Sequence, residues 1–219
     1  MENTKAAFWF FVVMGLVLLT GLAAALMEPS ADVRLALLAW QQLLFIVGGF
    51  LGSKREHYQS ISLRRLVQGL VCGVGLYFLN ILVGALTFAA FAQFLGSGAV
   101  RELLLRDRAP VEMLITSEKP FVAWGAVLLL LVGAPLGEEL FFRGLLVSLL
   151  RSRLGALQAV LLAGLLFALM HFYLLQFVPV LVSGIVLGLL FVRSDSIYVP
   201  IAAHLTVNAL ALLALLSSL

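Results

Sequence analysis

Residues 154–192 read LGALQAVLLAGLLFALMHFYLLQFVPVLVSGIVLGLLFV and contain no Asp, Glu, Lys or Arg. As one α-helix this run would be about 58 Å long, roughly twice the 30 Å hydrocarbon core of a bilayer. The run must therefore fold back on itself. Gln176 and the helix-breaking Pro179 mark the turn, so we predict two helices, near residues 155–174 and 179–192.

The rest of the chain has the same apolar character. Of its 219 residues 63% are hydrophobic and 11% are charged, whereas soluble domains average roughly 45–50% and 25%. Further charge-free runs occupy residues 6–27, 35–53, 66–100, 120–137 and 196–219. Because about 20 apolar residues form one transmembrane helix, the sequence predicts an all-α, polytopic membrane protein with about seven spans, and it leaves room for an eighth.

Too few residues remain outside these runs for a separate soluble domain, so we expect one integral membrane domain, residues 1–219. The 66–100 run is predicted to form one tilted helix that ends near Leu95, at the sequence Gly96-Ser97-Gly98. The mixed charges of residues 100–119 are typical of an amphipathic helix that lies on a membrane surface.

Basic residues gather on one side of the predicted spans, and cytoplasmic loops are enriched in Lys and Arg. Eight lie on the side of the N-terminus: Lys5, Lys54, Arg55, Arg64, Arg65, Arg151, Arg153 and Arg193. Five lie on the other side: Arg34, Arg101, Arg106, Arg108 and Lys119. We therefore expect a cytoplasmic N-terminus, in the plasma membrane of a bacterium. The same bias accounts for the net charge of +3, so nucleic acid is not an expected partner.

Three charges interrupt the apolar stretch between residues 121 and 150, in the sequence Gly137-Glu138-Glu139-Leu140-Phe141-Phe142-Arg143. Such charges are rare inside membranes, because each costs about 2.5–3.5 kcal/mol near a helix centre. Arg143 and Glu139 are four residues apart and are expected to pair on one helix face. Glu138 is turned by about 100° and is expected to face an internal cavity as a general base. The alternative is an ion pair at the membrane interface.

Two later spans carry polar residues at the same spacing of four. Phe167 precedes His171 in one of them, and His204 precedes Asn208 in the last. A lone histidine in a helix is more often a hydrogen-bonded packing residue than a site residue. His204 and Asn208 together would project into one interior groove.

Glu, His and Asn residues are suited to hydrolysis in two ways. In the first, Glu138 and His171 polarise a water that attacks a peptide carbonyl, while His204 and Asn208 stabilise the oxyanion. In the second, Glu138, His171 and His204 ligate Zn²⁺, and the fourth position holds the attacking water. The sequence leaves both open, so the cofactor is either zinc or none.

Two other functional classes remain as alternatives to a hydrolase. In a proton-linked membrane transporter, Glu138, His171 and His204 would form a protonation relay. In a catalytically silent membrane scaffold, the same polar groups would be structural only.

Three motifs in residues 121–219 resemble, in the same order, those of the CAAX protease and bacteriocin-processing family of intramembrane endopeptidases, which includes the Ras-converting prenyl-protein endopeptidases. The matching residues are Glu138, Glu139 and Arg143 for Glu-Glu-x-x-x-Arg, Phe167 and His171 for Phe-x-x-x-His, and His204 and Asn208 for His-x-x-x-Asn. Residues 1–119 carry no motif of this family. The resemblance implies N-terminal helices over residues 1–119 and catalytic helices over residues 120–219.

The resemblance also implies an intramembrane protease with a catalytic cavity open toward the cytoplasm. Its substrate would be a peptide or a protein tail, prenylated in the CAAX type, presented by the lipid bilayer. The family's residues map to Glu138 and His171 as water activators and to His204 and Asn208 as oxyanion stabilisers. Glu139, Arg143 and Phe167 would support them. Members of the family are described both as metalloproteases and as metal-free glutamate peptidases.

Overall fold

The computed structural model describes residues 2–27, 29–58 and 61–217, and within these ranges every regular element is helical. The predicted all-α class is therefore confirmed. The last predicted run extends to Leu219, and its final two residues lie outside the described part of the chain.

Six segments within the described ranges are long and apolar enough to cross a membrane. They are α1 (Glu2–Met27), α2 (Ala31–Gly52), α3 (Leu63–Leu95), the connected helices between Pro120 and Leu154, α9 (Phe177–Ser194) and α10 (Tyr198–Leu216). Helix α8 (Ala156–Leu169) is apolar but shorter. With α8 these segments correspond to the seven predicted spans, and the protein is a polytopic membrane protein.

The segment between Pro120 and Leu154 is one long helix that changes its winding four times. Its parts are α5 (Pro120–Leu128), the π-helical η2 (Leu129–Gly133), α6 (Ala134–Glu138), the π-helical η3 (Glu139–Val147) and α7 (Ser148–Leu154). Pro135 has no backbone N–H, and the N–H of Ala134 reaches back five residues to the carbonyl of Leu129. Wider π turns are frequent at functional sites, and here they adjoin both glutamates.

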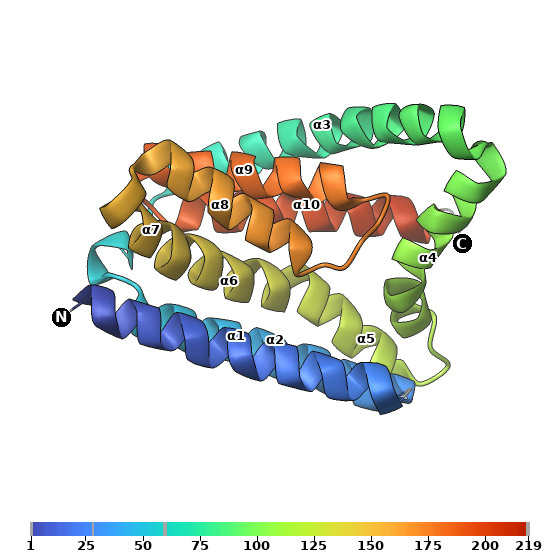
Figure 1. The fold of residues 1–219 in the computed structure, drawn as a ribbon, viewed down its shortest axis with the longest axis horizontal. Helices are drawn as coiled ribbons and strands as arrows, with labels where there is room; N and C mark the ends of the chain where they lie inside the picture. The colour runs from blue at the N-terminus through green and yellow to red at the C-terminus, as the bar shows by residue number, and fades with distance from the viewer. Residues whose placement is uncertain (1, 28, 59–60, 218–219) are drawn as a thin grey trace.

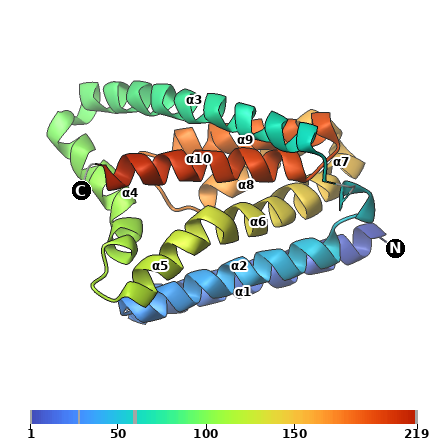
Figure 2. The same ribbon diagram turned by 180° about the vertical axis from the view of Figure 1, so that it is seen from behind.

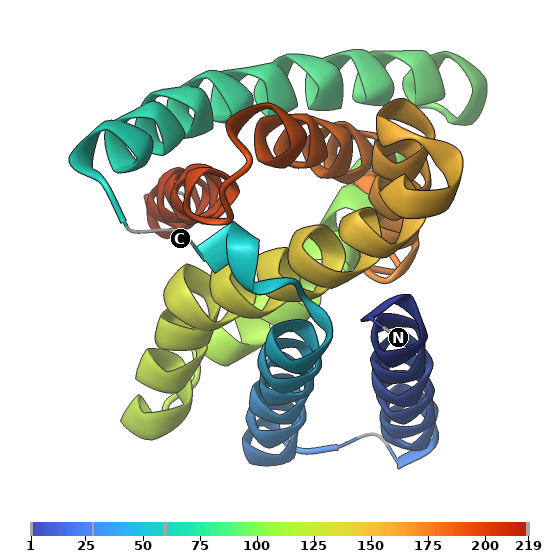
Figure 3. The same cartoon turned by 90° about the vertical axis from the view of Figure 1, so that its left-hand side faces the viewer.

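This broken segment lies in the middle of the bundle. The end-on view of Figure 3 shows α1 and α2 on one side of it and α3, α8, α9 and α10 on the other. Phe141 and Phe142 extend from its η3 part into the core, where the Phe45 ring of α2 stacks on Phe141 at a centroid distance of 4.8 Å. The segment thus carries its charged residues between two layers of apolar helices.

Helix α4 (Ser97–Ile115) crosses one end of the bundle, between the end of α3 and the start of α5 (Figures 1 and 2). Helix α3 ends as predicted, because Gly96 adopts a φ of +80°, which favours glycine. The N-terminus, the short helix η1 (Arg55–Tyr58) and α7 lie at the opposite end, together with the start of α3. The helix termini that carry the larger group of basic residues therefore meet at one end of the molecule.

Small residues let neighbouring helices approach closely. A Cβ atom on Gly184 of α9 would lie 3.0 Å from the Gly164 Cα of α8, and one on Gly73 of α3 would lie 2.6 Å from the Ala203 carbonyl oxygen of α10. Close contact through small residues is the usual way that helices pack in membranes. Gly73 and Gly184 are therefore packing residues at these helix contacts.

The prediction of a helix to residue 174 was wrong, because α8 ends at Leu169 and His171 lies in the linker 170–176. Phe172 in this linker has a φ of +54°, which a continuing right-handed helix does not allow. The backbone N–H groups of residues 174, 175 and 176 donate instead to the carboxylate of Asp107 on α4, at 3.1, 2.9 and 2.9 Å. A contact with a residue 67 positions earlier thus provides the acceptors that another helical turn would have supplied.

Candidate active site

A cavity of about 1330 Å³ lies in the half of the bundle next to α4. Its walls come from the C-terminal halves of α1 and α3, the N-terminal half of α2, and from α4, α6, α9 and α10. Glu138, His171, His204 and Asn208 all line it. The structure therefore brings the four predicted catalytic residues to one cavity, which extends from Glu138 to the α4 end of the molecule.

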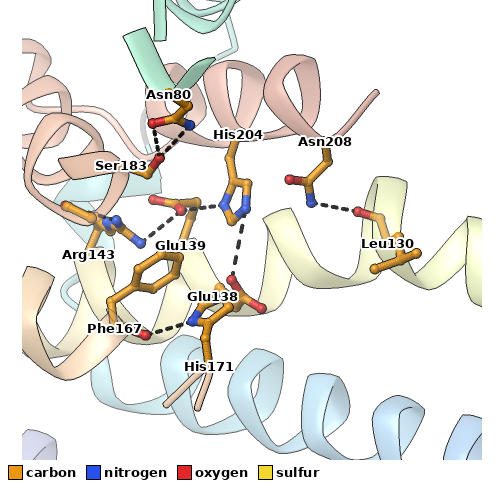
Figure 4. A network of polar contacts seen from close by, with 11 residues as sticks. Asn80, Leu130, Glu138, Glu139, Arg143, Phe167, His171, Ser183, His204 and Asn208 are labelled. Carbon is orange, nitrogen blue, oxygen red and sulfur yellow. Dashed lines mark hydrogen bonds and ion pairs between the residues drawn. The ribbon is translucent and has the colours of Figure 1, made fainter. Parts of the chain in front are cut away.

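Glu139 lies beneath this cavity and is fully buried, with an exposed fraction of 0%. Its Oε1 accepts hydrogen bonds from Arg143 Nη1 at 2.9 Å and from His204 Nδ1 at 2.8 Å (Figure 4). Within the described ranges, its Oε2 has no hydrogen-bond partner. The predicted pair with Arg143 forms, and the same carboxylate also orients His204.

Arg143 links three elements. Besides Glu139, its guanidinium donates to the Gly184 carbonyl of α9 at 3.0 Å, and its Cζ lies 4.6 Å from the centre of the Phe167 ring of α8. The Phe167 ring also packs edge-on against Phe142 at 5.2 Å. Arg143 thus stands behind the cavity wall, while Phe167 forms part of that wall.

Glu138 faces the cavity while Glu139 points away from it. The Oε2 atom of Glu138 lies 3.9 Å from His204 Nε2, beyond direct hydrogen-bonding distance. The difference between these neighbouring glutamates follows from their rotation about the helix axis, as the spacing predicted. Glu138 therefore has acceptor oxygens available to a molecule in the cavity.

The two histidines are each fixed through one ring nitrogen. His171 Nδ1 lies 2.7 Å from the Phe167 carbonyl oxygen, which can only accept, so Nδ1 carries a proton and, in the neutral ring, Nε2 is the nitrogen with the lone pair. His204 Nδ1 donates to the Glu139 carboxylate, which leaves its Nε2 on the side of Glu138. The hydrogen bond at Nδ1 fixes the orientation of each ring and the nitrogen that it presents to the cavity.

Asn208 lies one turn after His204 on α10, as Figure 4 shows. Its Nδ2 donates to the Leu130 carbonyl at 2.8 Å. The Ala134 N–H, which would pair with this carbonyl in an α-helix, bonds to Leu129 instead, and Pro135 has no N–H. Asn208 therefore joins α10 to the π-helical break, and the second hydrogen of its amide remains for the cavity.

Polar residues outside the predicted set also line the cavity, among them Gln42, Asp107 and Tyr173. Gln42 could have been noticed as part of a polar pair within the apolar text of α2. Asp107 gives no such signal, because a charge is ordinary in an amphipathic helix. Burial, together with the neighbouring Glu138 and Asp107 carboxylates, raises the pKa of Tyr173 to about 12, so its hydroxyl remains protonated at neutral pH.

A zinc site requires three protein ligands at about 2.0–2.2 Å from the ion. Among the described residues, no three His, Cys, Asp or Glu side chains are close enough to hold a metal ion together. Glu138 and His204 approach each other, but His171 does not complete a set with them. The three-ligand zinc site envisaged from the sequence does not fit this arrangement.

Comparison with protein families gives one match, over residues 120–210, to the family described as Rce1-like, type II CAAX prenyl endopeptidase Rce1-like. No curated protein and no solved structure matches the chain. The matched residues include all three polar motifs and the broken helix that carries Glu138 and Glu139. Residues 120–210 are therefore similar to the Rce1-like prenyl endopeptidases, which confirms the family resemblance indicated by the motifs.

Proposed function

We propose that the protein is an intramembrane endopeptidase that hydrolyses membrane-presented peptides or protein tails, CAAX-type tails among them. The Rce1-like match points to a protease of this kind. The observation that carries the proposal is the orientation of His171 and His204. Each is held through Nδ1 by an acceptor of the protein, which leaves Nε2 for a molecule in the cavity that Glu138 also lines.

In the proposed reaction, Glu138 and His171 Nε2 accept hydrogen bonds from one water molecule. One of them removes a proton as the water oxygen attacks the peptide carbonyl carbon. A carbon–oxygen bond forms, and the carbonyl electron pair moves onto the former carbonyl oxygen. When this tetrahedral intermediate collapses, the carbon–nitrogen bond breaks and the proton passes to the leaving amine.

His204 and Asn208 would stabilise the negative charge on that oxygen. His204 would donate from Nε2 in its doubly protonated form, in which Nδ1 still donates to Glu139. Asn208 would donate its second amide hydrogen, while the first holds it to Leu130. Donors fixed in advance in this way are the usual source of oxyanion stabilisation.

The decisive experiment is cleavage of a mixed peptide library, including farnesylated tails, by purified protein in lipid nanodiscs, with mass spectrometry as the readout. We expect Glu138→Gln to remain folded and to lower turnover by a factor of about 100 or more, because the general base is lost. The matched control is Glu118→Gln, the same change at an exposed site between α4 and α5. Equal product formation by wild type and Glu138→Gln would contradict the proposal.

Metal removal separates the two hydrolytic mechanisms. The side-chain mechanism predicts that products form at the wild-type rate after chelation and dialysis. Loss of activity that returns with added Zn²⁺ would overturn it. If no peptide is cleaved, proton flux in liposomes that depends on Glu138 would favour the transporter instead.

A further inference from the structure

Gln42 is a polar residue in the core-facing stripe of α2. The buried residues of this helix are Leu35, Gln42, Phe45, Gly48 and Gly49, whose spacing of three, four and seven defines one face. Gln42 is 2% exposed, and the other members of the stripe are apolar or glycine. An apolar side chain would be the ordinary choice here, because a buried amide costs free energy unless it is hydrogen-bonded.

The Gln42 amide does not obtain a full set of hydrogen bonds from the protein. No hydrogen-bond partner lies within reach of its buried Oε1 in the described part of the chain. Buried polar groups in native proteins are normally paired, and an unpaired one calls for a ligand or water. Oε1 itself is covered by protein atoms, so the unpaired amide indicates that a bound molecule supplies its partner once the amide turns toward the cavity.

The amide lies against the residue that precedes the proposed general base. A Cβ on Gly137 would lie 2.8 Å from Gln42 Oε1 and 3.0 Å from the Gln42 carbonyl oxygen, so this approach requires glycine. Glu138 follows directly, and both Gln42 and Glu138 line the cavity. A molecule that reaches Glu138 is consequently close to Gln42.

We propose that the Gln42 side chain hydrogen-bonds to the main chain of the substrate beside the scissile bond. The inference rests on the proposed peptidase function and adds a substrate-binding residue outside the matched residues 120–210. A primary amide carries a donor and an acceptor, which complement the C=O and N–H of a peptide. Rotation of the terminal amide by 180° exchanges the positions of its oxygen and its NH2 group, so either group can face the cavity. A bound peptide would displace water from the cavity, and the amide would be one of the polar groups left to pair with it.

The test is Gln42→Met, which keeps the size of the side chain and removes both hydrogen-bonding groups. We expect kcat/KM for a cleaved peptide to fall about tenfold, as for one or two neutral hydrogen bonds. We expect the melting temperature to remain equal or to rise, because an unpaired buried amide has been removed. The control is Gln68→Met, the same change at an exposed position of α3 that does not line the cavity. It should cleave as the wild type does.

A second readout links the effect to the substrate main chain. Peptides with single backbone ester bonds in place of the amides flanking the scissile bond would be compared in both proteins. At one position the ester should lower kcat/KM about three- to tenfold in wild type and have little further effect in Gln42→Met. Equal ester effects in the two proteins at every position would overturn the inference.

The outcomes distinguish this inference from the function on which it rests. If wild type and Gln68→Met cleave peptides and Gln42→Met does so equally well, the role of Gln42 is wrong and the peptidase stands. A lower melting temperature with unchanged kcat/KM would make Gln42 structural and would overturn the inference. If the wild-type protein cleaves nothing, both are overturned.

Discussion

Arg143 connects three helical elements through one guanidinium group. It bonds to Glu139 and to the Gly184 carbonyl and covers the Phe167 ring, with an exposed fraction of 1%. A fully buried carboxylate that loses its cation is left without compensation, and breaking such a pair costs about 3–5 kcal/mol. The sequence predicted the pair of Glu139 and Arg143, because residues four apart on one helix are neighbours in any tertiary surroundings.

We therefore predict that Arg143→Ala lowers the free energy of unfolding by about 3–5 kcal/mol and reduces the folded yield. Arg153→Ala, the same change at an exposed position of α7, is the control. Folded yield and thermal unfolding in detergent would be measured for both variants. Equal melting temperatures for the two variants would show that Arg143 does not have this role.

At the level of elements, the junction between α4 and the linker 170–176 controls where His171 lies. One carboxylate, Asp107, accepts three consecutive backbone N–H groups just before α9 begins. Hydrogen bonds to a charged acceptor contribute about 1.5–3 kcal/mol each. An element outside the matched residues 120–210 thus holds the linker that carries a proposed catalytic residue.

Asp107→Asn should loosen this linker, because the amide has only one acceptor oxygen and no charge. We expect hydrogen exchange of residues 174–176 to accelerate tenfold or more, from the loss of at least one charge-assisted bond. Glu102→Gln, an exposed carboxyl-to-amide change on the same helix, serves as the control. The exchange rates would be measured by mass spectrometry. Identical rates in Asp107→Asn and wild type would refute the role of Asp107.

For the whole molecule, the direction of the cavity ties the orientation in the membrane to function. The cavity extends to the α4 end, opposite the end where the N-terminus, η1 and α7 meet. If the N-terminus is cytoplasmic, the cavity extends toward the outer face. The family resemblance implies a cavity that opens toward the cytoplasm, so the two expectations exclude each other in this fold.

The excess of basic residues leads us to predict a cytoplasmic N-terminus. Single cysteines at Lys54 and Ser97, in a Cys72→Ser background, mark the two ends of the bundle. We expect an impermeant thiol reagent added to intact cells to label the Ser97→Cys variant and to spare the Lys54→Cys variant. The reverse pattern would place the cavity end in the cytoplasm, as in the family resemblance.

The sequence alone determined the features that depend on composition and short spacing. Apolar runs determine the all-α membrane fold because lipid leaves the backbone no partner outside a helix. Gly96 determined the end of α3, and the spacing of four determined the pair of Glu139 and Arg143. The catalytic roles of Glu138, His171, His204 and Asn208 remain predictions from the motifs.

Only the tertiary structure decided how those residues are oriented. The path of the linker after α8 depends on Asp107, the direction of His204 on Glu139, and the position of Asn208 on the Leu130 carbonyl. The partners in these three hydrogen bonds are 68, 65 and 78 positions apart. Helical periodicity carries information over one or two turns, so contacts at such separations arise only when the helices pack together.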